Sequence, residues 1–343
     1  MFQRWPLAPG NHILNGSAVK DRVLAILLGL ITLLLVVSVV RVVRGAWAAQ
    51  PSAALLSRAT VYLAPPPLYS ERGLDRPWRV GIQAGHWRID ELPNELGRLR
   101  SDTGAKFGNL QEADVNLAIA RRVAEDLTRA GVAVDLLPAT VPPGYDADAF
   151  VAIHADGGGP RERGFKVSAP WRASEAAVLL RDSLERAYET LSTIPLDRYG
   201  VTYNMRGYYA FSWYRFTSAV APSTPCAIIE TGFITSRADR AVIVDHPETA
   251  ASAITAGIIA YLGQRPALRS GDLVARSYAP MVVTSEGARL RFLPGDDERV
   301  AAVLPSGTVV HPLQVENGWV ELMQWGNFRV FGWMKAADLH PPG

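Results

Sequence analysis

The chain has a single cysteine, Cys226, among its 343 residues. One thiol excludes an intramolecular disulfide, and it excludes a metal site built on several cysteines. Cys226 lies in an apolar run with no histidine beside it, so we expect a small buried residue rather than a nucleophile. Net charge is also nearly absent, because the formal charge is only +2. So small a charge gives no reason to expect nucleic acid as a partner.

One long hydrophobic run lies near the N-terminus, where no residue from Val23 to Val40 is charged. At about 1.5 Å per helical residue, the run nearly spans a bilayer core of roughly 30 Å. A cleaved signal peptide is the alternative, because Ala46-Trp47-Ala48 resembles a small-x-small cleavage site. The run is, however, longer than the ~7–15 residues usual in such peptides. We predict a transmembrane helix over 23–45 that contacts the lipid bilayer, with a cytoplasmic tail over 1–22.

An α/β pattern follows a proline-containing linker predicted over 46–77. Short apolar runs then alternate with helical patterns as far as residue 264. Strands are expected over 79–83, 132–137, 148–153 and 227–229, and helices over 112–130, 174–191 and 247–262. Strands that alternate with helices imply a mostly parallel sheet with helices on both faces. We therefore predict an α/β domain over 78–264.

The C-terminal part has a different pattern, after a second linker predicted over 265–279. Short alternating runs such as 288–292 and 308–310 are separated by turns such as Asn317-Gly318. Such runs and turns predict a small all-β domain over 280–341.

Four side chains suit metal binding or acid–base chemistry. His86, His154 and Glu230 each follow an apolar run that predicts a buried strand, and Glu112 opens a predicted helix. In parallel sheets, functional residues collect at the carboxyl ends of the strands. Two histidines and one glutamate form a zinc set that leaves a coordination position open for water, and a further glutamate supplies a general base.

Each of the four also has a structural alternative. A single histidine at a strand end is often only a hydrogen-bonded structural residue. Glu112 has an alternative role as a first-turn acid favoured by the helix dipole. The alternative role for Glu230 is that of a solvated loop acid. Glu230 follows four apolar residues, however, and an ionised glutamate is rarely placed against a core without a partner. The four together, in this order, favour a hydrolase.

The same residues resemble a known family, the zinc-dependent N-acetylmuramoyl-L-alanine amidases, over about 80–262. The matching segments are Gly85-His86, Glu112 with Asn116-Leu117, Ile153-His154 and Glu230-Thr231-Gly232-Phe233. The resemblance implies that His86, Glu112 and His154 bind Zn2+ and that Glu230 is the catalytic acid/base. It also implies that peptidoglycan is the substrate, cleaved between N-acetylmuramic acid and L-Ala of the stem peptide.

The chain departs from the family pattern at several positions, none of them a predicted ligand. Gln83 stands where the family usually has Asp, and Trp87 and Arg88 stand where it has a Gly pair. Asp156 and Ser236 stand where Asn is common. We expect these changes to affect the support of the metal and the choice of substrate, because outer partners tune a metal site strongly.

Two further patterns bear on binding. The C-terminal part resembles a bacterial SH3-like barrel, in segments such as Asn317-Gly318-Trp319-Val320 and Gly332-Trp333-Met334. Domains of this kind often bind wall polymers or peptides. Trp171 and the aromatic residues between Tyr208 and Phe216 are candidates to line a glycan or peptide groove, with core packing as the alternative.

Three readings of the function stay open. The first is a hydrolase held in the bacterial cell membrane by a single pass, with its catalytic domain extracytoplasmic because the implied substrate lies outside. The second is a peptidoglycan-binding homologue without turnover, which the presence of Glu230 disfavours. The third is a zinc carboxypeptidase acting on wall peptides. Such peptidases pair His and Glu three residues apart, whereas Ile89 holds that position after His86. The sequence identifies no protein regulator.

Overall fold

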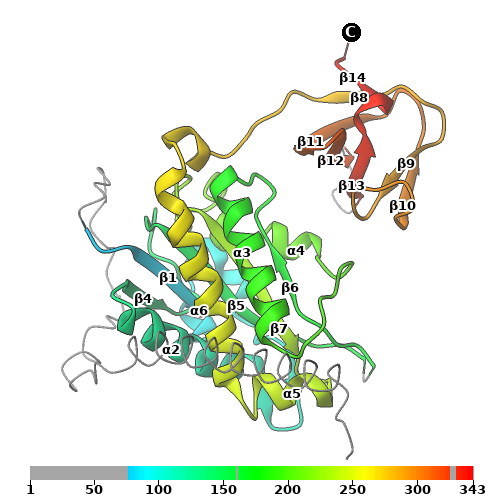
Figure 1. Ribbon diagram of the computed structural model, residues 1–343. Coiled ribbons are helices and arrows are strands. Elements are labelled where there is room, and N and C mark those ends of the chain that lie inside the picture. The colour runs from blue at the N-terminus through cyan, green and yellow to red at the C-terminus, as the bar shows by residue number, and fades with distance from the viewer. Residues whose placement is uncertain (1–75, 160, 325–329, 343) are drawn as a thin grey trace, which may run out of the picture. The chain divides into compact units, whose positions relative to one another are not determined.

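The computed structural model describes residues 76–159, 161–324 and 330–342 (Figure 1). The predicted tail over 1–22, the predicted transmembrane helix over 23–45 and nearly all of the predicted linker over 46–77 lie outside these ranges. Within the described ranges, no helix is long and apolar enough to cross a membrane.

A five-stranded sheet forms the centre of the predicted α/β part. Its strands are β1 (Arg79–Ala84), β4 (Ala133–Leu137), β5 (Ala149–Asp156), β6 (Lys166–Ser168) and β7 (Cys226–Phe233). They lie in the order β4-β1-β5-β7-β6. The first four pair in parallel, whereas β6 runs antiparallel to β7. The prediction of a mostly parallel α/β sheet is confirmed, and β6 is an edge strand that the sequence did not predict.

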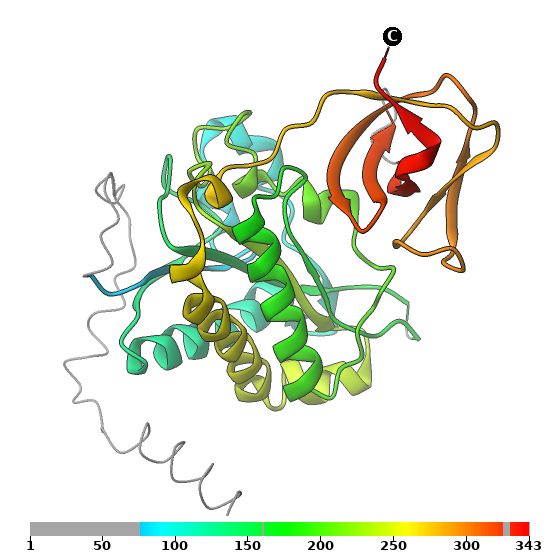
Figure 2. The same cartoon turned by 45° about the horizontal axis from the view of Figure 1, so that its top comes forward.

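Three long helices cover one face of this sheet: α2 (Glu112–Arg129), α3 (Glu175–Leu191) and α6 (Pro247–Gln264). Helices α3 and α6 lie side by side, and α6 also packs against α2 (Figures 1 and 2). Alternate strand residues such as Val80 and Ile82 join their apolar side chains in one core. The shorter helix α5 (Arg237–Ile243) adds to the same core.

Short helices and connecting segments cover the other face. These helices are η2 (Ile89–Glu91), η3 (Asn94–Leu99), α4 (Tyr203–Arg206) and η4 (Tyr209–Phe211). They form a second core with the alternate strand residues, for example Phe150 and Ile228. We had expected helices on both faces. The long helices all lie on one face, because the segments that cover the other are too short and irregular for a long amphipathic helix.

Helix α2 places one of the four candidate residues. Its apolar stripe of Val115, Ile119, Val123 and Leu127 is buried against the sheet, as its four-residue spacing predicted. A two-stranded hairpin, β2 (Lys106–Phe107) and β3 (Leu110–Gln111), leads directly into the helix. Glu112 is therefore the first residue of α2.

The C-terminal part forms a seven-stranded antiparallel sheet with its own small core. Its strands are β8 (Met281–Val283), β9 (Ala288–Arg291), β10 (Val300–Leu304), β11 (Val309–Glu316), β12 (Trp319–Gln324), β13 (Phe331–Lys335) and β14 (Leu339–His340). The 3-10 helices η5 (Arg265–Ala267) and η6 (Ser270–Leu273) precede it, and η7 (Ala336–Asp338) lies before β14. The all-β pattern is confirmed, and the SH3-like character stays a prediction.

Candidate active site

Adjacent strands bring the candidate residues together at the end of the sheet where the parallel strands have their carboxyl ends. Strand β5 lies between β1 and β7, and the register pairs His154 with Glu230. His86 follows the end of β1 by two residues, and Glu112 begins α2. His86, His154 and Glu230 therefore lie toward the carboxyl ends of parallel strands, as the sequence predicted, and Glu112 joins them from the start of α2.

Three of the four form a compact donor set. The Nδ1 atom of His154 lies 2.9 Å from Oε1 of Glu112, and Nε2 of His86 lies 3.5 Å from the same oxygen. One donor atom from each of these residues lies within 4.8 Å of the other two. Two imidazole nitrogens and a carboxylate oxygen so placed suit a zinc ion, with room for a further ligand.

Glycine backbone lies close to these ligand atoms. A Cβ at Gly85 would lie 2.3 Å from the ring of His154, and a Cβ at Gly104 would lie 2.4 Å from Oε2 of Glu112. Gly104 also has a φ of 75°, which favours glycine. The imidazole and the carboxylate are therefore held in spaces that only glycine leaves free.

Hydrogen bonds hold the carboxylate of Glu112. Its Oε2 accepts from the backbone N–H of Ala105 at 2.7 Å, and its Oε1 accepts from Nδ2 of Asn116 at 3.2 Å. Burial by itself raises the pKa of this carboxyl, but the bond and charge of His154, the charge of His86 and the Ala105 N–H together lower it to about 2. Glu112 is therefore an anion at neutral pH, as a metal ligand must be.

The two histidines are held in complementary ways. The Nδ1 atom of His86 lies 2.7 Å from the carbonyl oxygen of Asp102, which only accepts, so Nδ1 carries the proton and Nε2 is free to ligate. For His154, burial lowers the pKa, but the hydrogen bond and charge of Glu112 prevail and raise it. A metal cation that replaces the proton on Nδ1 of His154 faces the same negative carboxylate of Glu112.

Glu230 lies in a different environment from Glu112. Burial raises the pKa of Glu230 to about 8, against the opposing charges of His154 and Lys166. Lys166 is its cross-strand neighbour on β6, is buried, and lies 2.5 Å from Oδ2 of Asp156. Glu230 is thus a half-buried acid beside the donor set, with a pKa near neutral pH.

The segment after His86, where the chain departs from the family pattern, has an unusual backbone conformation. His86 and Arg88 both adopt left-handed backbone, with φ of 59° and 57°. Glycine reaches this region freely, whereas other residues do so at a cost of about 1–3 kcal/mol. The guanidinium of Arg88 contacts the carboxylate of Glu91 at 2.6 Å.

A cleft of about 580 Å3 opens over the donor set. His86, His154 and Glu230 line it, so three of the four candidate residues face one space. Of the aromatic residues proposed for a groove, Tyr208, Tyr209 and Phe216 line this cleft.

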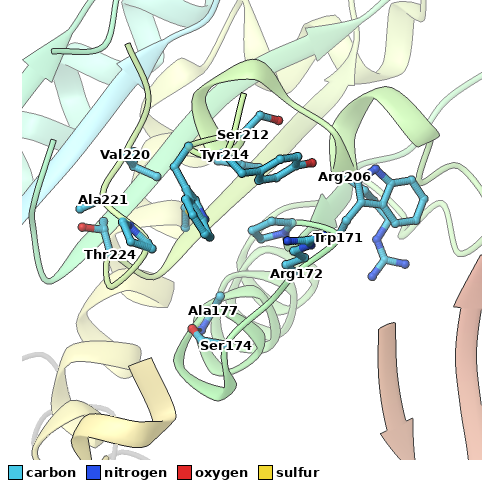
Figure 3. A pocket seen from close by; sticks show the side chains of 15 residues that line it. Trp171, Arg172, Ser174, Ala177, Arg206, Ser212, Tyr214, Val220, Ala221 and Thr224 are labelled. Atoms are coloured by element: carbon cyan, nitrogen blue, oxygen red, sulfur yellow. Dashed lines mark hydrogen bonds between the residues drawn. The ribbon is translucent and has the colours of Figure 1, made fainter. Parts of the chain in front are cut away.

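The other proposed aromatic residues line a separate crevice. Trp171, Phe211, Trp213 and Tyr214 surround it, and none of the four candidate residues contributes (Figure 3). Trp171 and Phe211 are buried, so they have the packing role that was the alternative for this group. The aromatic run is therefore shared between the cleft and this crevice.

Comparison with protein families identifies the α/β part. Residues 80–260 match the family Amidase_3, N-acetylmuramoyl-L-alanine amidase. The chain belongs to this family. All four candidate residues lie inside the match, which runs from β1 into α6. The chain is therefore a cell-wall hydrolase of the amidase class, with peptidoglycan as its substrate.

Solved structures of amidases resemble this fold. The amidase AmiC2 of Nostoc punctiforme is 23% identical, with a TM-score of 0.37 over 54% of this chain and 97% of that one. The amidase Ami1 from Mycobacterium smegmatis is 19% identical, with a TM-score of 0.40 over 55% and 97%. The amidase from Clostridium difficile 630 is 19% identical, with a TM-score of 0.38 over 55% and 97%. A comparison with curated protein sequences finds no match.

Sequence reasoning did not predict the contacts that four residues around the site make. Gln83 was noted only as a departure, although the two-residue period of strands places it on the same sheet face as His154. Asn116 was noted only as part of the family pattern, although it lies one helical turn after Glu112. Tyr208 was one of several aromatic candidates. Lys166 gave no signal, because β6 itself was not predicted.

Proposed function

We propose that this amidase is zinc-dependent and cleaves the amide between N-acetylmuramic acid and L-Ala of peptidoglycan stem peptides. One observation carries the proposal. His86, Glu112 and His154 place their donor atoms within 4.8 Å of one another, and Glu230 lies beside them on the neighbouring strand.

The residues present fit a zinc ion. Two neutral imidazoles and one carboxylate are a set typical of catalytic zinc, and Glu112 is held as an anion by its surroundings. When bound, zinc supplies a Lewis acid that polarises the amide carbonyl and lowers the pKa of a water molecule toward about 7.

Glu230 is proposed as the acid/base. It lies half-buried beside the donor set and takes no part in it, so its ionised form is free to accept a proton from water in the cleft. The same carboxyl then gives the proton to the leaving amine of L-Ala. An acid/base works best when its pKa lies near the working pH, and burial raises the pKa of Glu230 toward that range.

The variant Glu230→Gln tests this proposal. Gln keeps the size and hydrogen-bonding reach of the side chain but is a poor proton acceptor. Turnover of zinc-loaded protein on purified peptidoglycan should fall by about 10²–10⁴-fold. Zinc content per chain should stay near that of the parent, because Glu230 is outside the donor set.

Product analysis distinguishes the open alternatives. Release of stem peptides with a free N-terminal L-Ala supports the proposed bond, whereas release of single C-terminal amino acids would indicate a carboxypeptidase. A zinc-loaded parent that binds peptidoglycan but releases nothing would indicate the non-catalytic homologue. Undiminished release by Glu230→Gln would remove Glu230 from the reaction.

The location and the accessory part belong to the same proposal. We place the catalytic domain outside a bacterial cell membrane, held by a single transmembrane helix over 23–45, because peptidoglycan lies there. We assign an SH3-like, wall-binding role to 280–341. The antiparallel sheet of this segment supports that assignment.

A further inference from the structure

A chain of hydrogen bonds leads from the sheet to the outer nitrogen of His154. Gln83 is fully buried on β1, and its Nε2 lies 2.9 Å from the carbonyl oxygen of Ala139 and 3.2 Å from that of Pro138. Its Oε1 lies 2.9 Å from the hydroxyl of Tyr208. That hydroxyl lies 3.2 Å from Nε2 of His154.

The direction of each bond in this chain follows from the groups at its far end. Backbone carbonyls only accept, so the amide of Gln83 must turn its NH2 toward Pro138 and Ala139. Its Oε1 then faces Tyr208, and a buried amide oxygen needs a donor. The hydroxyl of Tyr208 supplies its single proton to that oxygen.

The hydroxyl of Tyr208 consequently presents a lone pair to His154. Tyr209, which also neighbours this hydroxyl, does not change the direction of the hydrogen bond between Tyr208 and His154. The hydroxyl of Tyr209, 3.3 Å from that of Tyr208, donates its own proton to the carbonyl of Ala139, so it has none to give to Tyr208. Nε2 of His154 is therefore the nitrogen that carries the proton.

We infer that Gln83 and Tyr208 are positioning residues that hold a proton on Nε2 of His154, so that Nδ1, beside Glu112, is the nitrogen whose proton a metal ion replaces. The 2.9 Å approach of Nδ1 to Oε1 of Glu112 places that nitrogen in the donor set. This inference rests on the proposed metal site but not on the proposed reaction.

The same logic explains glutamine at a position where the family usually has aspartate. A carboxylate at position 83 would face the carbonyl oxygens of Pro138 and Ala139 without a proton to offer either. The amide satisfies both carbonyls and still accepts from Tyr208. Gln83 and Tyr208 thus form one unit, in which neither replaces the other.

Zinc affinity tests this unit. In the full-length chain, Tyr208→Phe removes only the hydroxyl and Gln83→Met removes the amide at similar length. Each should weaken zinc binding by about 10- to 100-fold in chelator competition. The double variant should bind zinc as weakly as either single variant, because Gln83 and Tyr208 act through the same series of hydrogen bonds. Tyr261→Phe is the matched control: it removes a buried hydroxyl that donates to the carbonyl of Asp148, and zinc affinity should not change.

The tautomer itself is read by long-range 1H–15N NMR of histidine-labelled, zinc-loaded protein, since the chain has only six histidines. The signal missing in His154→Gln identifies residue 154. We expect its proton on Nε2, and this reading is made on the parent protein, with the variant used only for assignment. A proton on Nδ1, unchanged zinc affinity in Tyr208→Phe and Gln83→Met, or a parent that binds no zinc would each overturn the inference. Correct tautomer and tight zinc without amide hydrolysis would instead contradict the proposed function alone.

Discussion

Glu112 and Glu230 lie beside the same histidine, and their surroundings shift the pKa values of the two carboxyls in opposite directions. Both are withdrawn from water, which by itself raises the pKa of a carboxyl. Glu112 accepts from the backbone N–H groups of Ala105 and Ala155 and from the amide of Asn116, and it faces both imidazoles, so its pKa falls to about 2. Glu230 meets Asp156 and Glu112 among its neighbours, and its pKa rises to about 8. Two residues of one type can therefore serve as ligand and as acid/base.

This difference predicts how pH changes the stability of metal-free protein. The pKa of Glu230 is about 8 in the folded chain and about 4.5 unfolded, so between these values the folded state holds the extra proton. Stability from this group is present at low pH and is lost as pH rises. Relative to Glu230→Gln, the parent should lose up to about 1.4 kcal/mol of unfolding free energy per pH unit from about 4.5 to about 8.

Urea unfolding of both proteins in the presence of a chelator measures this difference. Above about pH 8 the two curves should run parallel. If parent and Glu230→Gln have the same pH dependence throughout, the carboxyl is not perturbed in the way described.

The glycine beside His154 gives a second prediction. Gly85→Ala should displace the imidazole, because the new methyl would lie 2.3 Å from the ring. We expect zinc content well below one per chain and turnover reduced by at least about 10-fold, as for loss of an outer partner of the metal. Gly97→Ala is the control, since its methyl would meet only Arg100 at 3.9 Å. Full zinc occupancy in Gly85→Ala would show that the loop adapts.

At the residue scale, the sequence predicted the four principal candidates but not the groups that form hydrogen bonds with them. His86, His154 and Glu230 follow apolar runs, and such positions are visible in a single sequence. Asp102 and Ala105 act through backbone atoms, a carbonyl for His86 and an N–H for Glu112. Any residue type supplies those groups, so no sequence pattern marks them.

At the scale of elements, periodicity was a good guide where packing is regular. The helix predicted over 112–130 is found at Glu112–Arg129, and the one predicted over 174–191 at Glu175–Leu191 with Ser174 as its N-cap. Strand β6 has only three residues, and the hairpin β2–β3 only two per strand. Elements this short contain too few residues to show a period in the sequence. Their positions are set by tertiary pairing.

The contact between α3 and α6 depends on one glycine, and this gives a matched pair of variants in one helix. A Cβ at Gly257 would lie 2.8 Å from Cα of Leu184 on α3, whereas a Cβ at Gly263 would meet nothing within 4 Å. Gly257→Ala forces the two backbones apart and should lower stability by about 1–3 kcal/mol. Gly263→Ala should raise stability by up to about 1 kcal/mol through helix propensity.

Urea unfolding of both variants at one pH measures these changes. Equal effects of the two substitutions would mean that α3 and α6 do not approach as closely as the structure places them. Zinc content should be unchanged in Gly263→Ala, which is remote from the donor set.

At the scale of the whole molecule, the sequence predicted the α/β part and the all-β part that the structure describes, but not the order of strands. The order β4-β1-β5-β7-β6 places β5 at the centre, between β1, which His86 follows, and β7, which contains Glu230. Strand order depends on pairings between distant segments, such as Ile153 with Ile229. A single sequence carries no direct record of such pairings, so the sheet could be predicted as parallel but not in its order.

The predicted anchor gives the last test, on the full chain in bacterial membranes. If 23–45 is an uncleaved transmembrane helix, the chain should stay in the membrane fraction through alkaline carbonate washing, with its N-terminal residues intact. Leu34→Arg with Val36→Arg should release it to the soluble fraction, because each arginine at the centre of a spanning helix costs about 2.5–3.5 kcal/mol. Ala53→Arg with Ala54→Arg is the control: it adds the same charge within the predicted linker, and the chain should stay in the membrane. A mature N-terminus near Ala49 in the parent would show instead that the run is a signal peptide, and the enzyme would then reach peptidoglycan without an anchor.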